Sequence, residues 1–307
     1  MLTISEKKLK DIMLYLADNG DRETMKQYNL APASLERYKR EARFDDGKIP
    51  RVLLLDIETT PLKFFGWGLG KQYVNYGQII DDWFMLSWSA KWLFSSEMKS
   101  EVLTPEESIN RDDSRIVKGI WQLMDDADII IAHNGNDFDI KRLNTRFILN
   151  KMLPPMPYKT IDTLKVARRN FAFSSNTLDY LGKLTLNKQK IKTDFKLWVR
   201  CLLGEQVALD YMLKYNEEDV LLEEEVYLEL RPWIRSHPNM ALYMEAKEEV
   251  CANCGTKKDL DWEIGTYTTQ VSQFTAFRCK NCGAISRCRT SNVSPERRKN
   301  LLISTAF

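Results

Sequence analysis

Two acidic residues at the end of an apolar stretch are the first sign of chemistry in this sequence. Asp56 and Glu58 follow four consecutive aliphatic residues, 52–55, and are separated by one residue. Because side chains alternate along a strand, both carboxylates are expected on one face. Two anions that close raise each other's pKa and cost stability unless a cation binds them, and Mg²⁺ and Mn²⁺ prefer oxygen ligands. A metal site and a polar strand end that turns at Pro61 fit this stretch equally well.

A second acidic pair lies where a strand is expected to pass into a helix. Asp137 and Asp139 belong to a polar turn that contains a glycine, between a predicted strand, 128–132, and a predicted helix, 140–149. Asp137 is suited to cap the helix. Asp139 is placed to point toward Asp56 or to act as a second capping residue, and the sequence leaves both roles open.

The third cluster lies within a long predicted helix, 206–230. Tyr215 and Asp219 are four residues apart, so they share one face of that helix. The other acids of the helix, Glu223 and Glu224 among them, are expected to form mostly a solvated surface.

Together the three clusters resemble the motifs of the DEDD exonuclease superfamily, whose catalytic domain has a ribonuclease H-like fold. The second motif has the spacing found in proofreading domains of family B DNA polymerases, and the third is the tyrosine form. The motifs occur in the order of the family, as Asp56-Ile57-Glu58, Asn134-x-x-x-Phe138-Asp139 and Tyr215-x-x-x-Asp219. The resemblance covers roughly residues 51–230.

The resemblance implies a metal-dependent 3′–5′ exonuclease that hydrolyses phosphodiester bonds, with single-stranded DNA as the first-choice substrate. Its catalytic residues would be Asp56, Glu58, Asp139, Tyr215 and Asp219. The four carboxylates would hold two Mg²⁺ or Mn²⁺ ions, and the tyrosine would orient the attacking water. The alternatives are a structure-specific endonuclease or ribonuclease on the same scaffold, and a non-catalytic DNA-binding adaptor in replication or regulation.

Four of the six cysteines form two Cys-x-x-Cys pairs, each followed by a glycine that permits a tight turn. These cysteines are Cys251, Cys254, Cys279 and Cys282. Four thiolates make the closed tetrahedral site that is typical of structural Zn²⁺. The alternating pattern at 266–277 predicts strands, so the segment is similar to a zinc ribbon whose folding free energy would come from the ion.

The N-terminal segment predicts three helices in a helix-turn-helix arrangement. The last of them, 33–43, carries Arg37 and Arg40, which are candidates for contact with a nucleic-acid groove or its phosphates. A small helical bundle that docks on a neighbouring domain is the alternative.

A second basic segment, 183–200, lies between the second and third motifs. Lys188, Lys190 and Lys192 are its candidates for a surface that follows the phosphates of the substrate, and a solvated loop is the alternative. Aromatic residues crowd the segment 64–94, where packing in a core or loop is favoured over stacking on bases.

Composition and length divide the chain into several modules. Its 307 residues have a net charge of only +2, so any surface for nucleic acid must be local. The expected modules are a helix-turn-helix-like segment (1–46), an α/β ribonuclease H-like mixed β-sheet flanked by helices (47–235), a zinc ribbon (245–290) and a basic tail (291–307). Nucleic acid is the expected partner, DNA before RNA, with a replication or repair protein as a further candidate. No membrane-spanning run and no apolar signal segment occurs, which favours the cytoplasm.

Overall fold

The computed structural model describes most of the chain, namely residues 8, 11, 12, 15, 23–30, 50–68, 70, 73–188, 190–244, 248–303 and 305. The chain divides into two compact units. One comprises Arg51–Pro238 with Cys282–Ala284, and the other comprises Met1–Pro50, Asn239–Asn281 and Ile285–Phe307. Within the described ranges, no helix combines the length and apolar character needed to cross a membrane.

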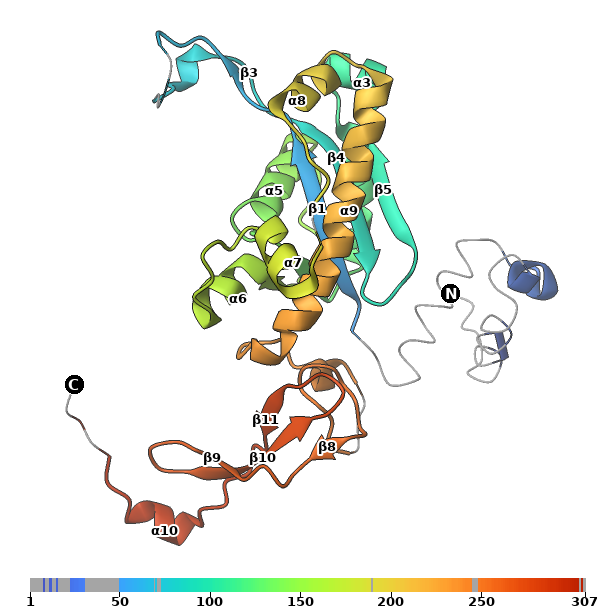
Figure 1. Cartoon of the computed structure of the whole chain (residues 1–307). Coiled ribbons are helices and arrows are strands. Elements are labelled where there is room, and N and C mark those ends of the chain that lie inside the picture. The colour runs from blue at the N-terminus through green and yellow to red at the C-terminus, as the bar shows by residue number, and fades with distance from the viewer. Residues whose placement is uncertain are drawn as a thin grey trace. The chain divides into compact units, whose positions relative to one another are not determined.

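The larger unit is built on a five-stranded mixed sheet, in the order β5-β4-β1-β6-β7. β1, β4 and β5 pair in antiparallel fashion, whereas β6 and β7 continue the sheet parallel to β1. These strands are β1 (Val52–Thr59), β4 (Met85–Trp92), β5 (Met98–Val102), β6 (Ile129–Ala132) and β7 (Lys159–Asp162). Figure 1 shows β1 at the centre of the sheet.

Helices cover both faces of this sheet. As a result, β4 is buried along nearly its whole length. The longest helix, α9, packs against β1, β4 and β5, as Figure 1 shows. The helices of the unit are α3 (Pro105–Asn110), α4 (Ser114–Asp125), α5 (Asp139–Leu149), α6 (Thr163–Asn170), α7 (Leu178–Leu186), α8 (Phe195–Leu202) and α9 (Gln206–Leu230), with the 3₁₀ turns η1 (Tyr76–Gln78) and η2 (Arg231–Trp233). The predicted mixed sheet flanked by helices is therefore confirmed.

The two faces of β1 have different tasks. Leu53, Leu55 and Ile57 are buried in one cluster with Ile116 and Ile120 of α4. Since neighbouring side chains of a strand point to opposite faces, the acidic residues between and beyond them lie on the other side of the sheet. The apolar face thus anchors the strand and fixes where the carboxylates point.

An insert between β1 and β4 extends away from the sheet (Figure 1). It contains β2 (Lys63–Phe64) and β3 (Ile79–Asp81), which pair with each other. Its aromatic side chains are exposed: Trp67 is 99% and Tyr76 92% accessible to solvent. The interpretation of these aromatics as packed in a core or loop is therefore wrong for the insert.

The smaller unit contains a second, short-stranded sheet. Its strands β8 (Leu260–Asp261), β10 (Gln273–Cys279) and β11 (Ile285–Arg287) lie in the order β11-β10-β8, and β9 (Thr266–Thr268) also pairs with β10. The 3₁₀ turn η3 (Met240–Tyr243) and the helix α10 (Pro295–Lys299) precede and follow these strands.

The N-terminal segment is described only in part. Residues 8, 11, 12 and 15 and residues 23–28 are helical, inside the first two predicted helices. The third predicted helix, with Arg37 and Arg40, lies outside the described residues.

Candidate active site

The carboxylates of the first and third motifs meet on the face of the sheet that α9 covers. One oxygen from each of Asp56, Glu58 and Asp219 lies within 4.8 Å of the other two. β1 supplies the first two residues, and the third comes from the middle of α9. A group of three carboxylates that close together has the ligand type and spacing for a divalent cation.

Asp139, the fourth carboxylate predicted from the sequence, lies beside this group rather than within it. It is the first residue of α5 and is only 2% exposed. Its Oδ1 accepts a hydrogen bond from the backbone N–H of Ile57, 3.2 Å away, which ties the start of α5 to β1 between Asp56 and Glu58. A negative charge at a helix N-terminus is also favoured by the helix dipole.

Asn216 is a member of the site that no sequence motif indicated. Its Nδ2 donates to Asp56 Oδ2 at 2.5 Å, and its Oδ1 accepts from Ser87 Oγ of β4 at 3.2 Å. The side chain is fully buried, so both contacts are shielded from water. Asn216 therefore fixes the orientation of one carboxylate through the neighbouring strand. Its position next to Tyr215 in the sequence is a weak signal, because a buried asparagine on a helix has many other uses.

Replacing Asn216 with alanine is expected to weaken metal binding and activity together. The variant leaves Asp56 without its 2.5 Å donor, and loss of such a supporting contact typically costs about 10- to 100-fold in metal affinity or activity. Titration of activity with Mn²⁺ measures the change. Asn239→Ala, which removes an exposed cap of a 3₁₀ turn, serves as the control. An unchanged Mn²⁺ requirement in Asn216→Ala would contradict the assigned role.

Burial and mutual repulsion raise the pKa values of the acidic group. For Asp56, burial is the largest cause, followed by repulsion from Asp139, Asp219 and Glu58. Burial and the Asp219 charge raise the pKa of Glu58 to about 8, and burial raises that of Asp139 to about 7. The protein thus holds several acids whose ionised forms are costly without a bound cation.

These shifts predict that the protein loses stability as pH rises when no divalent cation is supplied to the acidic group. The folded-state pKa of Glu58, about 8, exceeds its ordinary value of 4.5. Its stabilising contribution is therefore complete below 4.5 and is lost as pH rises through 8. His133, whose pKa is lowered from 6.5 to about 4, gives an opposing slope only below about pH 6.5.

Thermal unfolding in buffer without Mg²⁺ or Mn²⁺ checks this prediction between pH 6.5 and about 8, the window that these two pKa values define. The melting temperature is expected to fall across the window, less steeply in Glu58→Gln and in the presence of Mg²⁺. A melting temperature that rises with pH in the wild-type protein would show that the acids are not buried as described.

Lys190, predicted as a contact for nucleic acid, lies in the acidic group itself. Its Nζ forms an ion pair with Asp219 and lies 5.0 Å from the centre of the Tyr215 ring. Lys188 forms an ion pair with Glu225 at 2.5 Å, and Lys192 is exposed. Of the three, Lys190 is the one that lines the site.

Tyr215 is positioned as a hydrogen-bond donor. Burial and the nearby charge of Asp219 raise the pKa of Tyr215 to about 12, so its hydroxyl stays protonated beside that carboxylate. Trp198 packs edge-on against the Tyr215 ring with centroids 6.4 Å apart, and its side chain partly offsets the rise in the pKa of Glu58. Trp198 therefore lies beside two site residues.

A buried polar chain that the sequence did not reveal lies beside the carboxylates. His133 Nε2 is 3.0 Å from the carbonyl oxygen of Asn176, and its Nδ1 is 2.9 Å from Thr163 Oγ1. Burial lowers the pKa of His133 to about 4, so its ring is neutral. Because a carbonyl only accepts, Nε2 carries the proton and Nδ1 accepts from the hydroxyl of Thr163.

Glu223 completes this chain. Its Oε1 lies 3.4 Å from Thr163 Oγ1, and burial raises its pKa well above the usual range. The expected solvated surface is therefore wrong for Glu223, which is 1% exposed, and for Glu224, which is paired with Lys91.

These groups border a cavity of about 450 Å³, a size suited to a small ligand such as a nucleotide. The cavity is lined by acidic, basic, aromatic and neutral polar side chains, including Asp56, Glu58, Asp219, Tyr215, Lys190, His133, Asn134, Phe138, Arg168, Ser175, Asn176 and Thr177. A pocket with this lining presents both cation ligands and a positive group to an anionic substrate.

The four paired cysteines also come together. The sulfur atoms of Cys251, Cys254, Cys279 and Cys282 all lie within 4.8 Å of one another. Two of the sulfurs are 3.6 Å apart, close to the spacing of about 3.8 Å that a tetrahedral ion with 2.3 Å bonds requires. Gly255 has φ +72° and Gly283 φ +74°, so each knuckle uses its glycine for a left-handed turn. The geometry is compatible with a zinc ribbon.

Comparison with known proteins agrees with the fold of the larger unit. Residues 93–231 match the family model described as RNase H superfamily. The matched range includes Asp139, Tyr215 and Asp219 and begins after the first motif. The family B DNA polymerase from the hyperthermophilic archaeon Pyrobaculum calidifontis is similar over 60% of this chain and 25% of its own, with 16% identity and a TM-score of 0.45. No curated protein matches the sequence.

Proposed function

We propose, from the match of residues 93–231 to the RNase H superfamily, that the protein is a metal-dependent 3′–5′ exonuclease acting on single-stranded DNA. The family match supports the nuclease class. The observation that carries the finer assignment is the convergence of Asp56, Glu58 and Asp219 within 4.8 Å at a cavity that Tyr215 also lines. Direction and substrate come from the resemblance of the three motifs.

Divalent cations fit this donor set, which consists of carboxylate oxygens. Asp56, Glu58 and Asp219 would hold one ion directly, and Asp139 would contribute to a second. Bound Mg²⁺ or Mn²⁺ neutralises phosphate charge and lowers the pKa of a coordinated water.

The protein's own groups supply orientation. Tyr215 keeps its proton beside Asp219, where its hydroxyl is placed to orient a water molecule. Asn216 holds Asp56 through the hydrogen bond from its Nδ2. The neutral ring of His133 adds no positive charge beside the site.

In the same proposal the chain consists of a helical N-terminal module (1–46), the catalytic domain (47–235), a ribbon (245–290) and a basic tail (291–307). The ribbon would hold one structural Zn²⁺ through its four cysteines, an arrangement that suits the reducing cytoplasm. A replication or repair protein is a candidate partner for the end modules.

End-labelled oligonucleotides test the assignment. Single-stranded DNA, duplex DNA and RNA are incubated with Mg²⁺, with Mn²⁺ or with no added divalent ion. A ladder that shortens from the 3′ end of single-stranded DNA is expected. Internal cuts would replace the exonuclease with an endonuclease, preferred cleavage of RNA would replace it with a ribonuclease, and binding without cleavage under both metals would leave a DNA-binding adaptor.

A further inference from the structure

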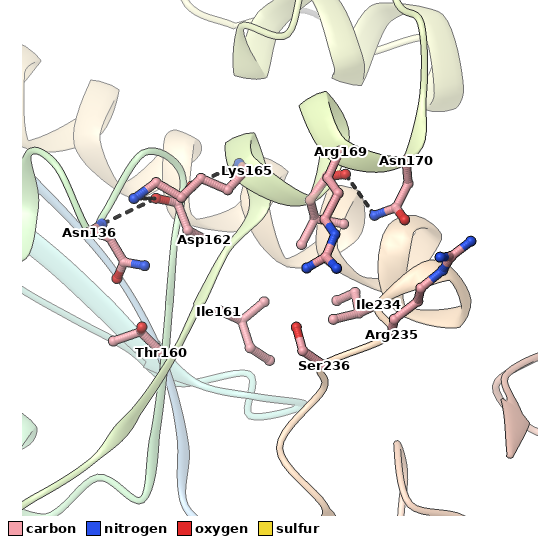
Figure 2. Close-up of a pocket in the computed structure, with 11 residues that line it drawn as sticks. Asn136, Thr160, Ile161, Asp162, Lys165, Arg169, Asn170, Ile234, Arg235 and Ser236 are labelled. Atoms are coloured by element: carbon pink, nitrogen blue, oxygen red, sulfur yellow. Dashed lines mark hydrogen bonds and ion pairs between the residues drawn. The ribbon is translucent and has the colours of Figure 1, made fainter. Parts of the chain in front are cut away.

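A second cavity lies in the larger unit, separate from the one at the carboxylates. Its volume is about 200 Å³, below the range of about 300–1,000 Å³ that is usual for pockets of drug-sized ligands. Figure 2 shows the side chains that surround it, which come from the loop after β6, from β7, from α6 and from the turn after α9. A cavity of this size suits a small group rather than a whole nucleotide.

The cavity is lined by three cationic side chains, Lys165, Arg169 and Arg235. Lys165 Nζ is engaged with Asp137 at 2.9 Å. In the ranges that the structure describes, neither the Arg169 nor the Arg235 guanidinium has a hydrogen-bond or ion-pair partner. Two arginines beside one hollow favour an anion with several oxygens, which the planar guanidinium binds well.

Asp162, the acid that lines this cavity, is already satisfied. Its Oδ1 accepts from the backbone N–H of Asn134 at 3.2 Å and of Lys165 at 3.1 Å, and its Oδ2 accepts from that of Asn136 at 3.3 Å. The Lys165 ammonium lies 3.8 Å from the same Oδ2. Because the Lys165 ammonium and three backbone N–H groups compensate the charge of Asp162, its repulsion of an anion near the arginines is reduced.

The same helix borders both cavities. On α6, Leu164 and Arg168 line the cavity at the carboxylates, whereas Lys165 and Arg169 line the second one. The loop after β6 repeats this division. Asn134 lines the first cavity and Asn136 the second, and both donate to Asp162. The two cavities are therefore separated by the single helix α6. A nucleic-acid strand that leaves the first cavity past Arg168 would reach the second cavity on the other side of that helix.

We propose that this second cavity is a phosphate-binding site, in which Arg169 and Arg235 hold a backbone phosphate of a nucleic-acid strand whose end lies at the carboxylates. The assignment to a strand phosphate rests on the proposed nuclease function. The chemistry of the pocket is equally that of free phosphate, so the experiment distinguishes the two sources.

The test compares the wild-type protein with Arg169→Gln/Arg235→Gln. Lys118→Gln/Lys151→Gln is the matched control, because it removes two exposed positive charges that line neither cavity. Binding of a long single-stranded DNA is measured by fluorescence anisotropy at several salt concentrations without Mg²⁺ or Mn²⁺. Binding of inorganic phosphate is measured by calorimetry, and hydrolysis of a trinucleotide with Mg²⁺ is measured separately.

The arginine variant is expected to bind the long strand about tenfold more weakly and to lose about 0.7 from the slope of log affinity against log salt, the value for one phosphate on a single strand. The control variant should change both quantities less. Loss of phosphate binding with an unchanged strand affinity would retain the site and assign it to free phosphate. Unchanged binding of both ligands would overturn the site.

Failure of the phosphate site and failure of the nuclease assignment give different results. In the proposal the trinucleotide is held mainly at the carboxylates, so its hydrolysis should change far less in the arginine variant than the binding of the long strand does. No hydrolysis by either protein would refute the nuclease alone, because the phosphate titration still tests the cavity.

Discussion

Asp56→Ala is expected to abolish hydrolysis while leaving the protein folded. Asp56 accepts a hydrogen bond from Asn216, and one of its oxygens lies within 4.8 Å of oxygens of both Glu58 and Asp219. Loss of a central metal ligand removes several kcal/mol of transition-state stabilisation, so a fall of about 10³-fold or more in rate is expected. Stability should not fall, because burial and three neighbouring carboxylates raise the pKa of Asp56 and make its charge costly.

The rate is measured on end-labelled DNA with Mn²⁺, and folding by the thermal transition. Glu218→Ala is the matched control, because Glu218 adjoins Asp219 on α9 but is exposed and lies outside the acidic group. A fully active Asp56→Ala protein would refute the proposed site. If Glu218→Ala lost as much activity as Asp56→Ala, the overall negative charge of α9, rather than the group of three carboxylates, would be responsible for activity.

Cys251→Ser is expected to abolish the proposed Zn²⁺ binding by the four cysteines and to unfold the C-terminal ribbon. The ribbon has a small apolar core, in which Phe277 packs against Trp262 with ring centroids 4.6 Å apart. A core of this size cannot offset the conformational entropy of its strands, whereas structural Zn²⁺ contributes about 10–16 kcal/mol. Metal analysis should fall from one zinc per chain to none, and the thermal transition of the ribbon should disappear.

Cys288→Ser is the control for the zinc experiment. Cys288 lies outside the group of four and has Glu249 3.9 Å from its sulfur. This variant should keep one zinc and both transitions. Retention of a full equivalent of zinc by Cys251→Ser would show that its thiolate is not a ligand.

The sequence predicted the elements that position the carboxylates because their patterns are local. Four consecutive aliphatic residues predicted β1, and the four-residue spacing of Tyr215 and Asp219 placed both on one face of α9. The three motifs also placed Asp56, Glu58 and Asp219 on the elements that bring them together. Residue type, strand alternation and helix period suffice for these features.

The supporting contacts were not predictable, because they depend on pairs distant in the chain. Asn216 contacts Ser87 across 129 positions, and Glu223 contacts Thr163 across 60. Nothing local distinguishes a buried glutamate on α9 from a solvated one. Likewise, the basic pattern around Lys190 indicated a surface for phosphates, and the fold turned this side chain inward to Asp219.

The antiparallel pairing of β1 with β4 makes the aromatic insert dispensable to the sheet. The ladder runs to Thr59 and Met85, and Thr60 N donates to Phe84 O at 2.9 Å, so the two strands are already closed before the insert begins. A short reverse turn in place of residues 62–82 would therefore join them without shifting their register. This deletion would therefore separate the contribution of the exposed aromatic side chains of the insert from that of the carboxylates at the site.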